Sequence, residues 1–357
     1  MNDSKSETTP MHKSPRQSRP TKPAWIGGSV LLAVLAFAIL FAFTDVSAFV
    51  DILTNADPVM LALPLLCVAA SYIAMALSYH GIAKAAGGEI SFVDMLRITL
   101  VANSLNYLLA TGGLSGFAAR MYYFTRKSIP PEKAVVISLA QTFLTNMTLL
   151  VFVLVGFAYL FTARELDGVA LAGSAVVLFV LLFVALGGAT ILLHRRLRRY
   201  VLSVTADLTH RTFRRLRPSS GMTRVSLRRY LATLDRGISF LVANWRAMAA
   251  PLFFITLDWL LTILILHACF LTIRHALPFA QTVVGFSVGI VVSFVSLIPG
   301  GLGIMEGSMS AVFAGMGVPF EAAVAAVLLF RVTYYILPLL VSLVFLGDML
   351  AQGRGAR

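Results

Sequence analysis

Charged side chains are scarce in this 357-residue chain. Asp, Glu, Lys and Arg make up only 13% of its residues, while hydrophobic residues make up 58% and the mean hydropathy is +0.85. An average soluble domain has about 25% charged residues, and a soluble chain of this size could not bury so much apolar surface in one core. The composition therefore excludes a soluble protein and indicates a helical membrane protein.

Cysteine and the common catalytic motifs are nearly absent. The two cysteines, Cys67 and Cys269, each lie inside an apolar run, which fits neither a disulfide framework nor a metal cluster. The chain has no Walker loop, no His-Glu-x-x-His and no Gly-x-Ser-x-Gly. We therefore expect no cofactor, no bound metal, no ATP-driven cycle within the chain and no covalent chemistry, although these absences leave an intramembrane transferase open.

Positive charge dominates, with 29 Lys and Arg against 16 Asp and Glu and a net charge of +13. The cations lie between the apolar runs, as the positive-inside rule expects, and no nucleic-acid recognition motif accompanies them. They are densest in the segment 194–246, which we predict to be cytoplasmic and to form amphipathic helices on the inner leaflet. Such a segment enforces topology and also attracts anionic lipid headgroups.

The apolar runs define a single integral membrane domain over 24–347. A spanning helix needs about 20 apolar residues. On this basis we predict about six full spans, at approximately 24–43, 58–80, 134–161, 168–193, 247–273 and 321–346.

The rest of the predicted organisation follows from those spans. A disordered tail (1–23) precedes the domain, whose first half (about 58–193) and second half (about 247–347) are separated by the basic segment 194–246, and a short tail (348–357) ends the chain. The distribution of Lys and Arg predicts a multi-pass protein of the bacterial inner membrane, with both termini cytoplasmic.

Two further apolar segments, at about 98–124 and 278–317, are broken by glycine. The first contains Thr111-Gly112-Gly113-Leu114, and the second contains Pro299-Gly300-Gly301-Leu302. Cations that follow the first break stay inside only if that segment dips into the membrane and returns. Each break is followed at similar spacing by Pro-x-Glu-x-Ala-Val, so we predict two re-entrant hairpins in an inverted repeat, a pointer to a transporter's central site. The alternative is a pair of kinked spans filled by neighbouring helices.

Ionisable residues inside the apolar runs are functional candidates by default. We predict that Glu306 and Arg331 face one interior and are coupled, and the alternative is a purely structural ion pair. Arg120 follows the first break and suits a lipid phosphate, or it snorkels at the inner interface. Asp258 and His267 are weaker candidates for a proton path. The predicted substrate-binding residues are Glu306, Arg331, Arg120, Pro299, Gly300, Gly301, Gly303, Gly112, Gly113, Gln141 and Asn106.

The element Pro299-Gly300-Gly301-Leu302-Gly303-Ile304-Met305-Glu306, followed by Arg331 and Pro338, resembles the lysylphosphatidylglycerol synthetase transmembrane-region family. The resemblance extends from about Trp25 to Leu346 and includes the first half around Asn106 and Arg120. The family includes the flippase part of the multiple peptide resistance factor, so the resemblance implies lipid translocation between leaflets. The synthetases carry a soluble aminoacyl-transferase domain after the membrane part, and this chain stops at Arg357, so we do not expect lipid aminoacylation.

These observations together predict a flippase-like translocase for a phospholipid or another polar-headgroup lipid. The expected partners are membrane lipids, anionic or aminoacylated, and either a second copy of the chain or a lipid-modifying enzyme. Two alternatives stay open. One is a non-catalytic membrane partner of a lipid- or glycolipid-modifying enzyme, and the other is a small-solute transporter.

Overall fold

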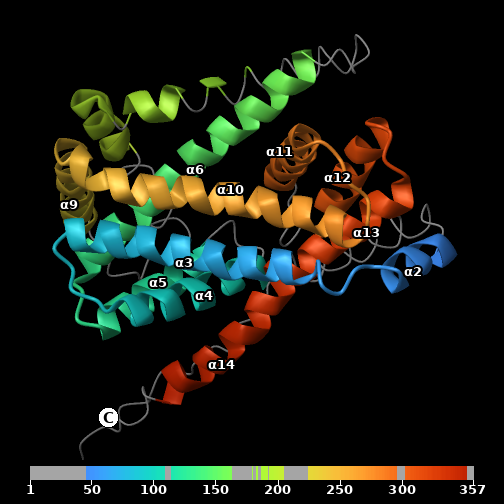
Figure 1. Cartoon of the computed structure of the whole chain (residues 1–357). Helices are drawn as coiled ribbons and strands as arrows, with labels where there is room; N and C mark the ends of the chain where they lie inside the picture. Colours follow the sequence, from blue (N-terminus) through green and yellow to red (C-terminus); the bar gives the residue numbers. More distant parts are fainter. Residues whose placement is uncertain are drawn as a thin grey trace, which may run out of the picture.

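The protein is an assembly of helices (Figure 1). The computed structural model describes residues 46–108, 114–162, 179, 182–183, 186–191, 193–204, 224–295 and 302–351. Within these ranges no residue lies in a strand, which confirms the predicted all-α class. The predicted span 24–43, most of the predicted span 168–193, the predicted tail 1–23 and residues 352–357 lie outside the described residues, whereas residues 348–351 of the predicted C-terminal tail belong to the last helix.

The helices have the following bounds: α2 Val46–Thr54, α3 Ala62–Ala85, α4 Phe92–Leu108, α5 Leu114–Arg126, α6 Pro131–Thr162, α9 Arg224–Ala243, the short 3-10 helix η1 Trp245–Met248, α10 Ala249–Thr272, α11 Phe279–Val295, α12 Ile304–Gly315, α13 Phe320–Arg331, the π-helical turn η3 Val332–Ile336, and α14 Leu337–Ala351.

Four stretches are long and apolar enough to cross a membrane, and they occupy 62–85, 131–160, 245–272 and 320–345. They coincide with four of the predicted spans, because the length of an apolar run sets the length of the helix that lipid can solvate. Among the described residues, α11 is also apolar over 279–293, but this stretch is shorter than a membrane-spanning helix.

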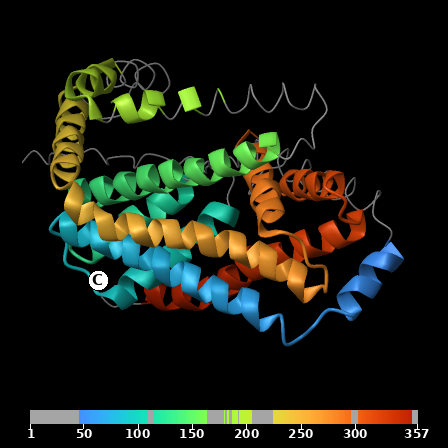
Figure 2. The same ribbon diagram turned by 45° about the horizontal axis from the view of Figure 1, so that its top comes forward.

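Helices α3 and α10 pack side by side and antiparallel at the centre of the protein (Figures 1 and 2). The Asp57 backbone N–H, which precedes α3, donates to the Thr272 carbonyl at the end of α10, 2.8 Å away. At the other end Gly81 of α3 lies against the Pro251 ring. A Cβ atom at position 81 would stand 3.0 Å from Pro251 Cγ. Glycine at position 81 therefore allows the two backbones to approach closely.

Helices α4 and α5 form the first of two antiparallel helical pairs. The Asp94 carboxylate and the Lys127 ammonium join its open end at 2.9 Å, and Lys133 anchors this end by donating to the Gly87 carbonyl at 2.8 Å. The open end therefore lies where α3 ends and α6 begins. Near the turn of the pair, the Asn106 side-chain oxygen accepts the Gly116 N–H at 2.7 Å.

Helices α11 and α12 form the second antiparallel pair. Gly285 and Gly289 of α11 face Phe313 and Met309 of α12, so the pair opens toward the end of α10 and the start of α13. This is the opposite end of the α3–α10 pair from the open end of α4–α5 (Figure 1). The two helical pairs therefore open toward opposite ends of the α3–α10 pair.

The last long helix contains a widened turn, which the apolar pattern did not predict. The turn η3 links α13 to α14, and the Leu337 N–H donates to the Val332 carbonyl five residues earlier. Pro338 follows at once and has no N–H to continue the normal helical ladder. The wider turn brings Tyr334 and Tyr335 into the helix interface, where both rings lie near Tyr107.

Tight packing between α11 and α12 leads to a stability prediction. We expect Gly285→Ala to destabilise the protein by about 1–3 kcal/mol, because the added methyl group overlaps the fully buried Phe313 ring. Gly307→Ala on α12 is the matched control, since nothing lies near that position and alanine favours a helix. Thermal unfolding of the two purified variants in detergent measures the difference. Equal unfolding temperatures would contradict the packing described here.

Candidate functional site

Glu306 and Arg331 form an ion pair in the interior. Glu306 is fully buried and Arg331 is 6% exposed, and Arg331 Nε contacts Glu306 Oε1. The second carboxylate oxygen of Glu306 accepts the Gly303 N–H at 2.8 Å. Gly303 has φ +80°, a conformation that favours glycine, and it immediately precedes α12. Glu306 therefore both caps the start of α12 and holds it to α13.

The remaining contacts of Arg331 surround its guanidinium group with protein. Its Nη2 lies 3.3 Å from Met305 Sδ, and its central carbon lies 4.2 Å from the centre of the Tyr335 ring. That ring packs on Tyr107 of α4, with 4.4 Å between the two ring centres. The pair thus ties α12 and α13 to the first helical pair through one aromatic contact.

Arg120 is a buried cation that has no counter-ion among the described residues. It lies on α5 and is 5% exposed, and its guanidinium carbon stands 5.2 Å from the centre of the Tyr79 ring on α3. Its Nε is buried without a hydrogen-bond partner, and no carboxylate among the described residues lies within ion-pair distance. The cation–π contact offsets only part of the desolvation cost of the charge. Arg120 therefore offers hydrogen bonds and charge to an incoming anion.

Asn106 and Gln141, both predicted site residues, bind protein groups. Asn106 at the tip of α4 accepts hydrogen bonds from the Gly116 N–H and from the Ser115 hydroxyl, at 2.7 and 3.3 Å. Gln141 of α6 is 2% exposed, accepts from the Ser78 hydroxyl at 2.8 Å and donates to the Thr145 hydroxyl at 3.4 Å. These side chains position the helices around Arg120.

The glycine residues of the site are only partly described. Gly303 lies directly before α12. The other predicted site residues of this kind, Gly112, Gly113, Pro299, Gly300 and Gly301, lie outside the described residues. Gly116, which the sequence analysis did not single out, lies so close to Asn106 and to the Ala102 carbonyl that a Cβ would stand 2.5 Å from that oxygen. The close approach keeps the tips of α4 and α5 together.

A set of polar and charged side chains lies on the two helical pairs, on α3 and α10 between them, and on α13 and η3. We call it the interior polar band, and it comprises Arg120, Tyr79, Asp258, Tyr334, Tyr335, Arg331 and Glu306. Sequence reasoning missed its tyrosines, because tyrosine in an apolar helix is usually read as an interface anchor. The signal available in the sequence was the adjacent pair Tyr334 and Tyr335, which lies far from either end of the predicted span 321–346.

The band contains charges of both signs but no metal centre. Within the described residues, no group of three or more His, Cys, Asp or Glu is placed to hold a metal ion. The arrangement instead presents one buried cation, one ion pair and one buried carboxylate along the path between the helical pairs. Such a path can stabilise a polar group inside an otherwise apolar protein.

Residues 25–342 match the family described as the lysylphosphatidylglycerol synthase TM region. The chain belongs to this family. A UPF0104 membrane protein of Pyrococcus horikoshii is 24% identical over 321 residues, which cover 88% of this chain and 94% of the relative. A UPF0104 membrane protein of Methanothermobacter thermautotrophicus is 28% identical over 179 residues, or 47% of this chain and 50% of the relative. The match confirms the family resemblance seen in the motif around Glu306.

Membership of the lysylphosphatidylglycerol synthase TM region family agrees with the four long apolar helices, and the chain is a membrane protein. The family match covers both helical pairs, so the interior polar band lies within the matched region.

Proposed function

We propose that this protein moves a lipid with a phosphate-bearing polar headgroup between the leaflets of the bacterial inner membrane. The observation that carries the proposal is Arg120, a cation that is 5% exposed and has no counter-ion in the part of the chain that the structure describes. A permanently unpaired charge is costly at that depth, and a phosphodiester is an anion that guanidinium binds well. The family's description, which refers to a lipid synthase, supports a lipid as the ligand.

The two helical pairs support a transport mechanism. We propose that α4–α5 and α11–α12 are re-entrant hairpins that enter the membrane from opposite faces, as an inverted repeat requires. Their glycine-broken turns would then approach each other near the midplane. The headgroup would cross along the interior polar band, while the acyl chains stay in the bilayer.

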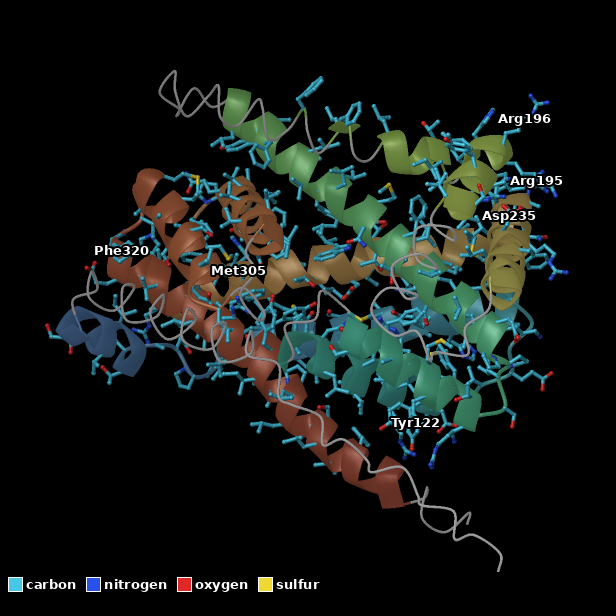
Figure 3. All side chains as sticks on the ribbon, turned by 180° about the vertical axis from the view of Figure 1, so that it is seen from behind. Tyr122, Arg195, Arg196, Asp235, Met305 and Phe320 are labelled. Atoms are coloured by element: carbon cyan, nitrogen blue, oxygen red, sulfur yellow. The ribbon has the colours of Figure 1, made fainter. Side chains whose placement is uncertain are left out.

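The basic end of the molecule supports an orientation. Arg195 and Arg196 lie at the opposite end of the molecule from Phe320, the first residue of α13 (Figure 3). The end of α3, the end of α5 and the start of α6 lie at the same end of the molecule as α9, which Arg198 contacts through Asp235 (Figure 1). Lys84, Lys127 and Lys133 belong to or directly adjoin these helix ends. By the positive-inside rule this end would face the cytoplasm, so the α4–α5 hairpin would enter from the cytoplasmic face.

The ionisable residues receive different roles in this proposal. Arg120 binds the headgroup phosphate. Arg331 is already engaged by Glu306, so the pair holds α12 against α13 beside the path, and it meets a headgroup only if the pair opens. No residue is assigned covalent chemistry, and the proposed partners are membrane lipids.

Movement of a headgroup-labelled lipid tests the function. The purified full-length protein is reconstituted into vesicles that contain phosphatidylglycerol with a fluorescent headgroup, and a membrane-impermeant quencher is added outside. A translocase exposes the inner-leaflet label within the experiment, whereas in protein-free vesicles about half of the label stays protected. Protection equal to that of protein-free vesicles with anionic, zwitterionic and aminoacylated lipids would refute the proposal. Uptake of a radiolabelled small solute without lipid movement would instead identify a solute transporter.

A further inference from the structure

Asp258 is a further buried ionisable group of the interior polar band, and the proposed function gives it no role. It lies in the middle of α10 and is 4% exposed. Its Oδ1 accepts a hydrogen bond of 2.5 Å from the Ser71 hydroxyl on α3. Among the described residues no Lys, Arg or His lies within ion-pair distance of its carboxylate.

The groups that face Asp258 from the neighbouring helices are neutral tyrosines. Tyr72 and Tyr79 face it from α3, Tyr107 from α4 and Tyr334 from η3, all within electrostatic reach. Arg120 is a charged group that, like Asp258, lies within electrostatic reach of Tyr79. The carboxylate therefore lacks the cation that would stabilise its ionised form in a dry interior.

Two ways remain to neutralise such a carboxylate: a bound cation or a bound proton. Asp258 lies in tightly enclosed surroundings, where Tyr72 and Tyr334 are 3% and 4% exposed and their ring centres are 6.3 Å apart. A proton needs no cavity, whereas an ammonium group or a metal ion does. Hydroxyl groups lie nearby, because the Thr262 hydroxyl is 2.8 Å from the Asp258 backbone carbonyl and 3.3 Å from the Tyr334 hydroxyl.

Asp258 and Arg120 are placed to influence each other's ligands. Both lie within electrostatic reach of Tyr79, so the field of an ionised Asp258 opposes the binding of an anion at Arg120. When Asp258 carries a proton, that opposition disappears and the anion binds more tightly. Linkage is reciprocal, so a bound anion at Arg120 in turn favours the proton on Asp258.

We propose that Asp258 is a proton carrier that couples lipid movement to a proton gradient, an inference that rests on the proposed function. The carboxylate takes a proton from water on one side of the membrane, forming the O–H bond of a carboxylic acid, together with headgroup binding at Arg120. It returns the proton to water on the other side as the headgroup leaves. One proton and one anionic headgroup then move together.

The distribution of labelled phosphatidylglycerol under a pH gradient tests this coupling. In vesicles with a gradient of one pH unit, the wild-type protein should concentrate the label in one leaflet by up to about tenfold, and reversing the gradient should reverse the asymmetry. Asp258→Asn, which mimics the protonated acid, should still move lipid but reach equal leaflets. Glu89→Gln, at an exposed carboxylate in the loop between α3 and α4, should behave as wild type.

The outcomes separate the coupling from the function itself. Rapid movement by the wild type to equal leaflets under either gradient would overturn the proton carrier and leave the translocase intact. Asymmetry that follows a sodium gradient, or that Asp258→Asn retains, would overturn it equally. If no lipid moves, infrared spectroscopy still decides: a protonated carboxyl band at neutral pH must be present in the wild type and absent in Asp258→Asn, and its absence from the wild type refutes the proposal.

Discussion

Replacing Arg120 with glutamine is expected to slow transbilayer movement of a labelled anionic lipid by about 10- to 100-fold. Charge-assisted hydrogen bonds to a phosphate contribute about 1.5–3 kcal/mol, which corresponds to that range. Arg120→Lys keeps the charge but loses the forked donor geometry, so its rate should lie between those of the wild type and Arg120→Gln. The quenching measurement in vesicles provides all three rates.

The same substitution should leave the fold at least as stable as before, because it removes a buried charge for which the described residues supply no counter-ion. Loss of activity without loss of stability is the signature of a ligand-binding residue. Arg126→Gln is the matched control, since Arg126 lies on the same helix but is exposed, with its guanidinium carbon 4.8 Å from the centre of the Tyr122 ring. Wild-type lipid movement by Arg120→Gln, or equal slowing by Arg126→Gln, would remove Arg120 from the proposed path.

Breaking the Glu306–Arg331 pair should produce the largest loss of stability. Removing one partner leaves the other charge buried and unpaired, so Glu306→Gln and Arg331→Met should each cost about 3–5 kcal/mol. The double variant should recover most of that loss, because both charges are then absent and glutamine still accepts the Gly303 N–H. Denaturant or thermal unfolding in detergent measures the three variants.

A pair nearer the surface provides the comparison for this cycle. The side chains of Lys127 and Asp94 are 40% and 24% exposed, and removal of either should change stability by about 1 kcal/mol or less. A double variant of Glu306 and Arg331 that is as unstable as either single variant would show that the two residues act independently. The ion-pair assignment would then be wrong.

Much of the helical framework could be predicted from the chain itself. The long apolar runs near 58–80, 134–161, 247–273 and 321–346 predicted the four long apolar helices, because a chain in lipid must satisfy its backbone hydrogen bonds within each segment. Glu306 and Arg331 were recognised as candidates for a similar reason, since ionisable residues are rarely tolerated in apolar runs. The predicted hairpins, inverted repeat and substrate contacts remain predictions.

Contacts between distant helices decided the rest. Arg120 reads equally well as a snorkelling residue, and only the packing of α5 on Tyr79 of α3 places its charge in the interior. Asp258 has no partner nearby in sequence, and the fold supplies Ser71 from 187 residues away. The apolar pattern indicates which helices can lie in a membrane, because this depends on the length and composition of each segment. Which polar groups meet inside depends on helix rotation and on helix pairing, and these are set by tertiary packing alone.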